Sequence, residues 1–83
     1  MKGRRIYPDK GEEFKPGDYG QGSDELWYCR PPNPEIHLGN LRAHQVEEHE
    51  DGTITVSPSI LIEEGTGGPL WHGWLKKGEW TEA

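Results

Sequence analysis

The alternation of apolar and polar residues is clearest in the middle of the chain, where it predicts a β-hairpin. Residues 46–49 lead into Glu50-Asp51-Gly52, and Thr53-Ile54-Thr55-Val56 then places β-branched side chains on one face. Ser57-Pro58-Ser59 ends this strand, since Pro58 has no N–H to donate to a ladder. The next apolar run, Ile60-Leu61-Ile62, predicts a further strand.

A second hairpin is predicted near the end of the chain, with Lys76-Lys77-Gly78 as its turn. Alternation places Trp71, Gly73 and Leu75 on one face of its first strand, and His72 and Trp74 on the other. Since aromatic residues occupy both faces, we expect the N-terminal residues or a partner to cover one of them. The Gly-rich run 65–69 is expected to be a connecting loop.

The remaining segments support an all-β fold, a small antiparallel meander or partly open barrel. Leu26–Cys29 predicts a short strand that ends at Pro31-Pro32-Asn33-Pro34. Residues 35–48 favour loop and strand, with a short helix capped by Asn40 as the alternative. Residues 1–24 are rich in Gly, Pro and charge and keep no period, so we expect an extended N-terminal arm. That arm is either disordered or docked on a neighbouring subunit or partner, and the β domain is expected at 25–83.

Composition limits how this domain can be stabilised. Only 30% of the 83 residues are hydrophobic, with a mean hydropathy of -0.98, so large aromatic residues must supply much of the core. Small domains of this kind often gain stability by oligomerising or by docking on a partner, so homo-oligomerisation stays open. The expected core comprises Leu26, Trp27, Ile54, Val56, Ile60, Ile62, Trp71, Trp74, Leu75 and Trp80.

The negative charge is confined to one part of the chain. The net charge is -6, residues 1–24 balance to zero, and no Lys or Arg occurs between Arg42 and Lys76. Such a surface repels phosphate groups, which argues against direct nucleic-acid binding. No apolar stretch approaches a membrane span, so no membrane association is expected, and the basic N-terminus lacks the apolar segment of a signal peptide. Cys29 is the only cysteine, which favours a reducing cytoplasm.

Motifs for catalysis or cofactor binding are weak. Cys29 and the four histidines (His37, His44, His49 and His72) lack paired metal-ligand spacing, so we expect no metal site, although a small metalloprotein remains an alternative. Ser57 and Ser59 sit in no nucleophile motif, and Cys29 in an apolar strand is expected to be a buried small hydrophobe. The carboxylates of the first hairpin surround a solvated turn. The chain is therefore expected to be no enzyme and to bind no cofactor.

Two blocks of the sequence resemble a family of small proteins from tailed phages and prophages. They are Glu48–Ile60, which is most like versions from actinobacterial phages, and Trp71–Trp80. The resemblance covers about residues 25–83 and implies a genomic setting without an activity. Some members carry paired cysteines that look like a zinc knuckle. This chain departs from that pattern, because Trp27-Tyr28-Cys29-Arg30 has no second cysteine nearby.

These observations predict a non-catalytic, phage-encoded accessory factor that binds a host protein through an acidic, tryptophan-bearing surface. The expected partner-binding residues are Glu47, Glu48, Glu50, Asp51, Trp71, Trp74 and Trp80. An alternative is a minor virion component whose N-terminal arm contacts neighbouring phage subunits. The expected location is the cytoplasm of the infected bacterium, or the virion in the alternative.

Overall fold

The chain folds almost entirely as short β-strands. A computed structural model describes residues 1–63 and 69–83, and its only helical element there is a 3-10 turn, η1 (Pro8–Lys10). The prediction of an all-β domain is confirmed. The helix considered for residues 35–48 does not form, and loop and strand occur instead. The strands are β1 (Arg4–Arg5), β2 (Asp18–Gln21), β3 (Trp27–Cys29), β4 (Gly39–Asn40), β5 (Gln45–Glu48), β6 (Ile54–Ser57), β7 (Ile60–Glu63), β8 (Pro69–Lys76) and β9 (Glu79–Glu82).

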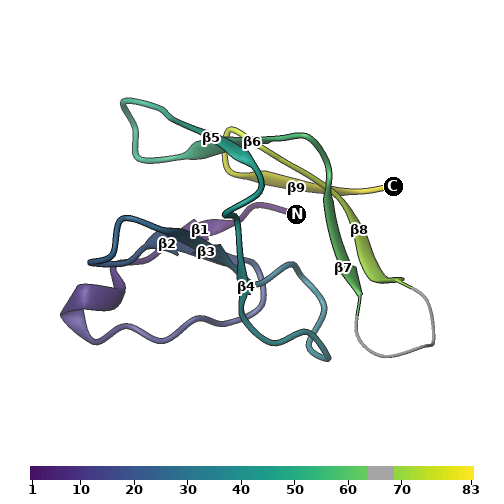
Figure 1. The fold of residues 1–83 in the computed structure, drawn as a ribbon, viewed down its shortest axis with the longest axis horizontal. Helices are drawn as coiled ribbons and strands as arrows, with labels where there is room; N and C mark the ends of the chain where they lie inside the picture. The colour runs from purple at the N-terminus through teal and green to yellow at the C-terminus, as the bar shows by residue number, and fades with distance from the viewer. Residues whose placement is uncertain (64–68) are drawn as a thin grey trace.

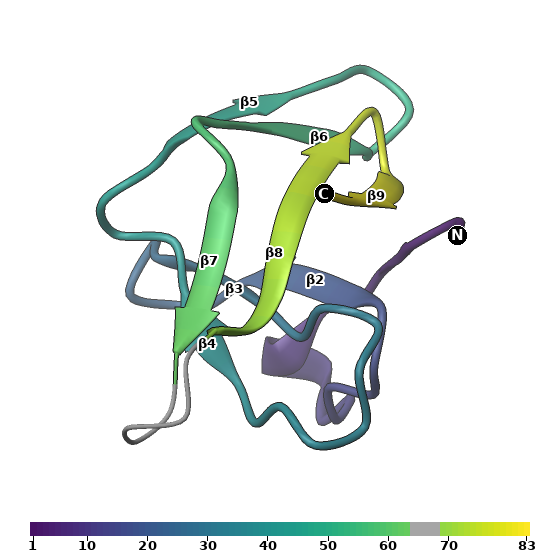
Figure 2. The ribbon, with the colours of Figure 1, turned by 90° about the vertical axis from the view of Figure 1, so that its right-hand side faces the viewer.

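The strands form three small sheets around one core (Figures 1 and 2). Their orders are β1-β2-β3-β4, β5-β6 and β7-β8-β9, and every pairing except the parallel β1–β2 contact is antiparallel. Figure 1 places the β5–β6 hairpin above the first sheet, with β7 and β8 running down one side. The expected loop at 65–69 lies outside the described residues except for Pro69, which begins β8.

Both predicted hairpins are present, and the second turns at Lys77-Gly78 because Lys76, expected in the turn, ends β8. In β5–β6, Gln45 pairs with Ser57 and Glu48 with Ile54, and Gly52 has a φ of 88°. In β8–β9, Lys76 pairs with Glu79, and the turn uses φ angles of 47° at Lys77 and 77° at Gly78. Positive φ at both central residues matches the twist of a tight hairpin. Between these hairpins the chain leaves β6 at Ser57 and starts β7 at Ile60, as Pro58 predicts.

Residues 1–24 correct the expected boundary, because they are built into the domain. The segment is extended, but it supplies β1 and β2, and the proposed junction at 24/25 falls inside the β2–β3 hairpin. Residues 1–3 also bond to the last hairpin: Trp80 donates its N–H to the Met1 carbonyl at 2.8 Å, and Gly3 donates to Gly78 at 2.7 Å. The N-terminal segment therefore joins two sheets of its own chain.

The core confirms most of the expected residues and adds others. Trp71, Leu75 and Gly73 face inward from β8, and a Cβ at Gly73 would lie 2.6 Å from the Trp71 ring, so the strand needs glycine there. Four of the expected core residues are only half-buried: Leu26, Trp27, Ile62 and Trp74. The buried residues are Ile6, Tyr19, Cys29, Ile36, Leu41, Ile54, Val56, Ile60, Trp71, Leu75 and Trp80.

Candidate functional site

The tip of the β5–β6 hairpin is held by bonds within its own turn. His49 donates its N–H to the Thr53 carbonyl at 2.8 Å, and Gly52 donates to the His49 carbonyl at 3.0 Å. The Asp51 carboxylate accepts the Thr53 hydroxyl at 2.6 Å and the Thr53 N–H at 3.0 Å. These two bonds, the hydroxyl first, lower the pKa of Asp51, so this carboxylate is ionised at neutral pH.

The hairpin gathers the four acidic residues expected to bind a partner. Glu47, Glu48, Glu50 and Asp51 are all exposed. Glu48 forms an ion pair with Arg5, whose Nη1 lies 3.0 Å from the carboxylate. Within the described part of the chain, neither Glu47 nor Glu50 has a cationic partner. The hairpin therefore keeps unneutralised negative charge that faces solvent.

Arg5 anchors the hairpin tip to the N-terminal segment. Its Nη1 also donates to the Gly52 carbonyl at 2.9 Å. Its guanidinium lies over two rings, 4.9 Å from the Tyr7 centroid and 4.7 Å from the Trp27 centroid. Only 15% of the Arg5 side chain is exposed, so these contacts are shielded from water. No sequence pattern pointed to Arg5, because it lies 43 residues before Glu48.

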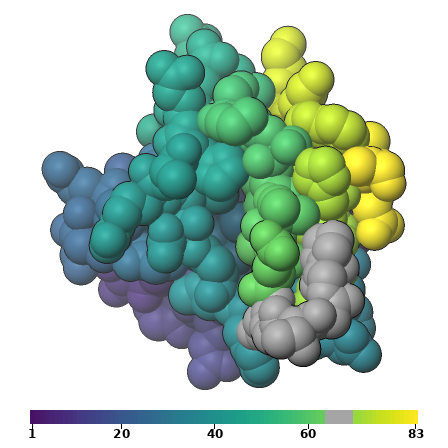
Figure 3. Space-filling view, turned by 45° about the vertical axis from the view of Figure 1, so that its right-hand side comes forward, coloured from purple at the N-terminus to yellow at the C-terminus, as the bar shows by residue number. Residues whose placement is uncertain are grey.

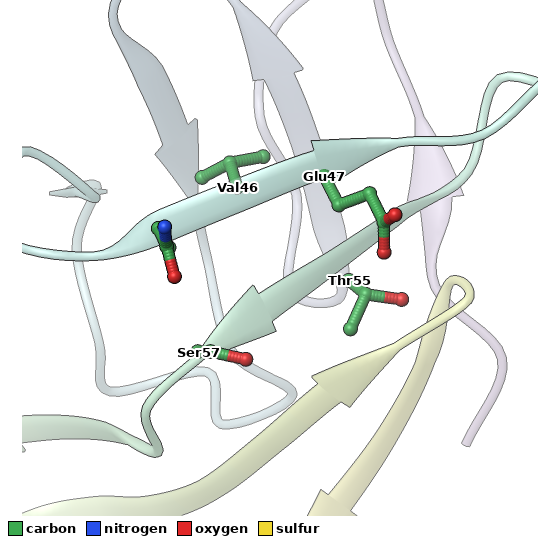
Figure 4. A pocket seen from close by; sticks show the side chains of 5 residues that line it. Val46, Glu47, Thr55 and Ser57 are labelled. Atoms are coloured by element: carbon green, nitrogen blue, oxygen red, sulfur yellow. The ribbon is translucent and has the colours of Figure 1, made fainter.

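A polar groove of about 400 Å³ lies along the same hairpin (Figure 4). Figure 4 shows Glu47 of β5 facing Thr55 of β6, with Ser57 further along that strand. The Thr55 hydroxyl accepts the Lys77 N–H at 3.0 Å and lies 2.7 Å from His49 Nε2. One free carboxylate among amide and hydroxyl groups suits a cationic or hydrogen-bond-donating group. The residues lining the groove are Gln45, Val46, Glu47, Thr55 and Ser57.

Of the groove residues, sequence reasoning found only Glu47, although the turn contained a signal for the others. Counting outward from the three-residue turn Glu50-Asp51-Gly52 pairs Glu47 with Thr55 and Gln45 with Ser57, as the structure has them. These pairs share one face because side chains alternate along a strand. The hairpin register therefore predicts this polar face, which the acidic residues alone do not reveal.

Two of the three tryptophans expected at the binding surface are core residues. Trp71 and Trp80 are each 3% exposed, and their rings meet edge-to-face with centroids 5.4 Å apart. The Trp80 indole also donates to the Gly17 carbonyl at 2.9 Å. Burial thus excludes both from direct contact with a partner. Trp74 is half-buried on β8, and its ring lies beside that of His72 with the two centroids 5.9 Å apart.

Three of the four histidines are positioned for hydrogen bonds, and His49 bonds within its hairpin. His72 Nε2 lies 3.0 Å from the Ser59 hydroxyl, so it bonds to the segment before β7. His44 is half-buried with Nε2 3.1 Å from the Ser59 carbonyl. No acidic side chain among the described residues orients His72 as a base for Ser59. In the described ranges, no three His, Cys, Asp or Glu side chains gather closely enough to hold a metal ion.

Cys29 behaves as the small hydrophobe that its apolar strand predicts. It is a free, fully buried thiol on β3. Burial raises its pKa from 9.0 to about 12. At neutral pH the sulfur is protonated and inaccessible, which is the opposite of a reactive thiolate.

A second, smaller groove of about 260 Å³ lies where β4 approaches β7. Leu38 and Leu61, each 48% exposed, contribute apolar surface to it. Its remaining lining residues are Ile36, His37, Gly39, Ile62 and Glu63. This groove contains one acid and one histidine, so it is much less acidic than the β5–β6 hairpin.

Protein-family models, curated proteins and solved structures were compared with the chain, and none of them matches it. A search of the described residues for a helix long and apolar enough to span a membrane found none.

Proposed function

We propose that this protein is a non-catalytic binding domain that docks on a basic surface of another protein through the β5–β6 hairpin. The main support for this proposal is the negative charge of that hairpin, which the described residues do not neutralise. Glu47 and Glu50 are exposed and lack a cationic partner in the described ranges. Arg5 does not neutralise them, because its guanidinium is bonded to Glu48 and to the Gly52 carbonyl. Complementary charge on a partner would both steer association and fix its orientation.

The resemblance of residues 25–83 to phage and prophage proteins suggests where such a domain acts. A phage-encoded factor made in the cytoplasm of an infected bacterium meets host proteins with basic surfaces, many of which hold nucleic acid. We therefore propose a host protein as the partner. The virion alternative relied on a free N-terminal arm, and that support is weaker because residues 1–24 pack within their own domain.

Charge reversal on the hairpin tests this function. A pull-down from bacterial host lysate compares the wild-type chain with the double variant Glu47→Lys/Glu50→Lys. Both side chains are exposed and neither makes a bond within the described residues, so the fold should tolerate the change. We expect the captured partner to be lost, and raised ionic strength to weaken its capture by the wild-type chain.

The matched control is Glu13→Lys/Glu35→Lys, which makes the same change in net charge at exposed positions away from the hairpin. Circular dichroism confirms that both variants fold. Loss of the partner in the first variant alone supports the hairpin as the docking surface. Equal capture by both variants, or equal loss in both, would show that the hairpin does not carry the interaction.

A further inference from the structure

The outer edge of β5 carries backbone groups with no partner. β5 pairs only with β6, and its other side is open within the part of the chain that the structure describes. The bond from the His49 N–H to the Thr53 carbonyl fixes which residues face β6. Since hydrogen-bonded pairs alternate along an antiparallel ladder, Gln45 and Glu47 bond to β6. The N–H and C=O groups of Val46 and Glu48 therefore point away from the sheet.

This edge lacks most of the features that usually prevent a strand from pairing with another chain. Natural edges are protected by proline, charged side chains, bulges or very short strands. β5 has no proline, lysine or bulge, since Gln45–Glu48 pairs with β6 at four successive positions without an irregularity. Its only charges are the acidic Glu47 and Glu48, which repel an acidic strand and attract a basic one. Two other edges differ: β4 is only two residues long, and β7 has a register shift between Ile62 and Glu63. Figure 3 shows the teal surface of the β5 region on the outside of the molecule.

The two faces of β5 differ in chemistry. The outer face presents Gln45 and Glu47 beside the polar groove, and the inner face presents the half-buried Val46 and the exposed Glu48. Glu48 is already paired with Arg5. In an added strand, neighbouring side chains would lie on the same faces as those of β5. A basic residue on the outer face would thus meet Glu47, and an apolar residue on the inner face would meet Val46.

A second copy of this chain is a poor occupant of the edge. Pairing β5 with β5 would gather four glutamates, Glu47 and Glu48 of each copy, in one short two-stranded ladder, and this accumulation of like charge is destabilising. An extended segment with alternating basic and apolar residues has the complementary pattern. We propose that β5 receives such a segment of the partner protein as an added strand. This inference rests on the proposed function and specifies how the same hairpin binds.

The test uses a fluorescently labelled nine-residue peptide in which Lys and Val alternate. Two further peptides carry N-methyl groups on every Val or on every Lys. In an added strand, the N–H groups of one set point at β5 and those of the other set point at solvent. We expect one methylated peptide to bind at least tenfold more weakly than the unmodified peptide, and the other to bind within about threefold. Methylation of Val is the damaging change in an antiparallel pairing, and methylation of Lys in a parallel one.

A structural readout accompanies the affinities. The amide protons of Val46 and Glu48 should become protected from exchange with solvent in the complex with the unmodified peptide, whereas Glu47 should change little. Equal binding of the two methylated peptides, or loss of both, would overturn strand addition, as would unchanged exchange at Val46 and Glu48.

The charge-reversal variants separate this inference from the proposed function. If the unmodified peptide binds the wild type and Glu13→Lys/Glu35→Lys but not Glu47→Lys/Glu50→Lys, the hairpin is a basic-partner site. If in that case both methylated peptides bind equally well, strand addition fails and the proposed function stands. If the unmodified peptide fails to bind the wild-type chain, or binds all three chains equally, both proposals fail.

Discussion

At the scale of single residues, most of the arginines act as internal connectors. Arg4 bonds to the buried Asp18 through two nitrogens, at 3.2 and 3.0 Å. Arg30 donates to the carbonyls of Ile36 and Phe14, each at 3.0 Å. Like Arg5, both residues use their guanidinium groups in bonds within the fold. The acidic character of the surface is therefore concentrated on the hairpin more strongly than the net charge of -6 conveys.

Replacing Arg5 with lysine tests how this residue holds the hairpin. Lysine keeps the charge, but it has no planar group to lie over the rings of Tyr7 and Trp27. We expect Arg5→Lys to lower the free energy of unfolding by about 1–2 kcal/mol. Urea denaturation followed by tryptophan fluorescence measures the change. Arg42→Lys, at an exposed side chain without a hydrogen bond in the described residues, should stay within about 0.5 kcal/mol. Equal effects of the two substitutions would contradict this role.

Cys29 predicts a loss of stability in alkali. Its pKa is about 12 in the folded protein and 9.0 in the reference state, so between these values the unfolded chain binds fewer protons than the folded one. Raising the pH therefore favours unfolding, by up to about 1.4 kcal/mol per pH unit from this group. The contribution is fully present below pH 9. Tyr19 acts in the same direction, because burial raises its pKa.

Unfolding free energies measured by urea denaturation from pH 8 to 11 check the thiol's share. Cys29→Ala lowers stability at every pH by removing buried atoms, but its decline above pH 9 should be shallower than that of the wild type. The tyrosine contribution is common to both chains and cancels in the comparison. Parallel declines in the two chains would show that Cys29 does not titrate as its burial implies.

At the scale of elements, local turn chemistry made the hairpins predictable. Glycine-containing turns identify both hairpins, and the register follows by counting outward from a three-residue loop at 50–52 in the first and from a two-residue loop at 77–78 in the second. β1 and β2 gave no such signal, because Arg4–Arg5 is stabilised as a strand only by its contact with Asp18–Tyr19. The prediction of tryptophans at the binding surface was wrong for a related reason. Composition supplies four tryptophans, but it does not say that the fold buries Trp71 and Trp80.

The same counting predicts how fast the amides of β5 exchange with solvent. Gln45 and Glu47 should exchange slowly, since their N–H groups bond to β6, whereas Val46 and Glu48 should exchange at least tenfold faster in the free protein. Amide exchange followed by nuclear magnetic resonance resolves these four positions. The central strand β8, which pairs on both sides, is expected to contain the slowest amides. Protection at Val46 and Glu48 in the free chain would mean that another segment already covers this edge.

At the scale of the whole molecule, residues 1–24 complete the core and connect the first sheet to the last hairpin. They contribute Ile6 and Tyr19 to the buried residues, and Gly17 accepts the Trp80 indole bond across 63 positions of sequence. Sequence reasoning missed this because the segment has few apolar residues and no period. Its two buried apolar side chains are placed by pairing with distant strands. Long-range contacts of this kind leave no local pattern in a single sequence.

A chain truncated to residues 25–83 should therefore fail to fold, even though that range contains both predicted hairpins. It loses two fully buried side chains, Ile6 at 0% and Tyr19 at 1% exposure, each worth roughly 2–5 kcal/mol when removed from a core. The total free energy of unfolding of a small domain is about 5–15 kcal/mol. The truncation also removes β2, so its hydrogen bonds to β3 are lost. We expect no cooperative thermal transition in circular dichroism, and red-shifted tryptophan emission as Trp71 and Trp80 meet water. Adding residues 1–24 as a separate peptide should restore part of the blue-shifted emission. If residues 25–83 alone kept the transition of the full chain, the N-terminal segment would be the accessory arm that its composition predicts.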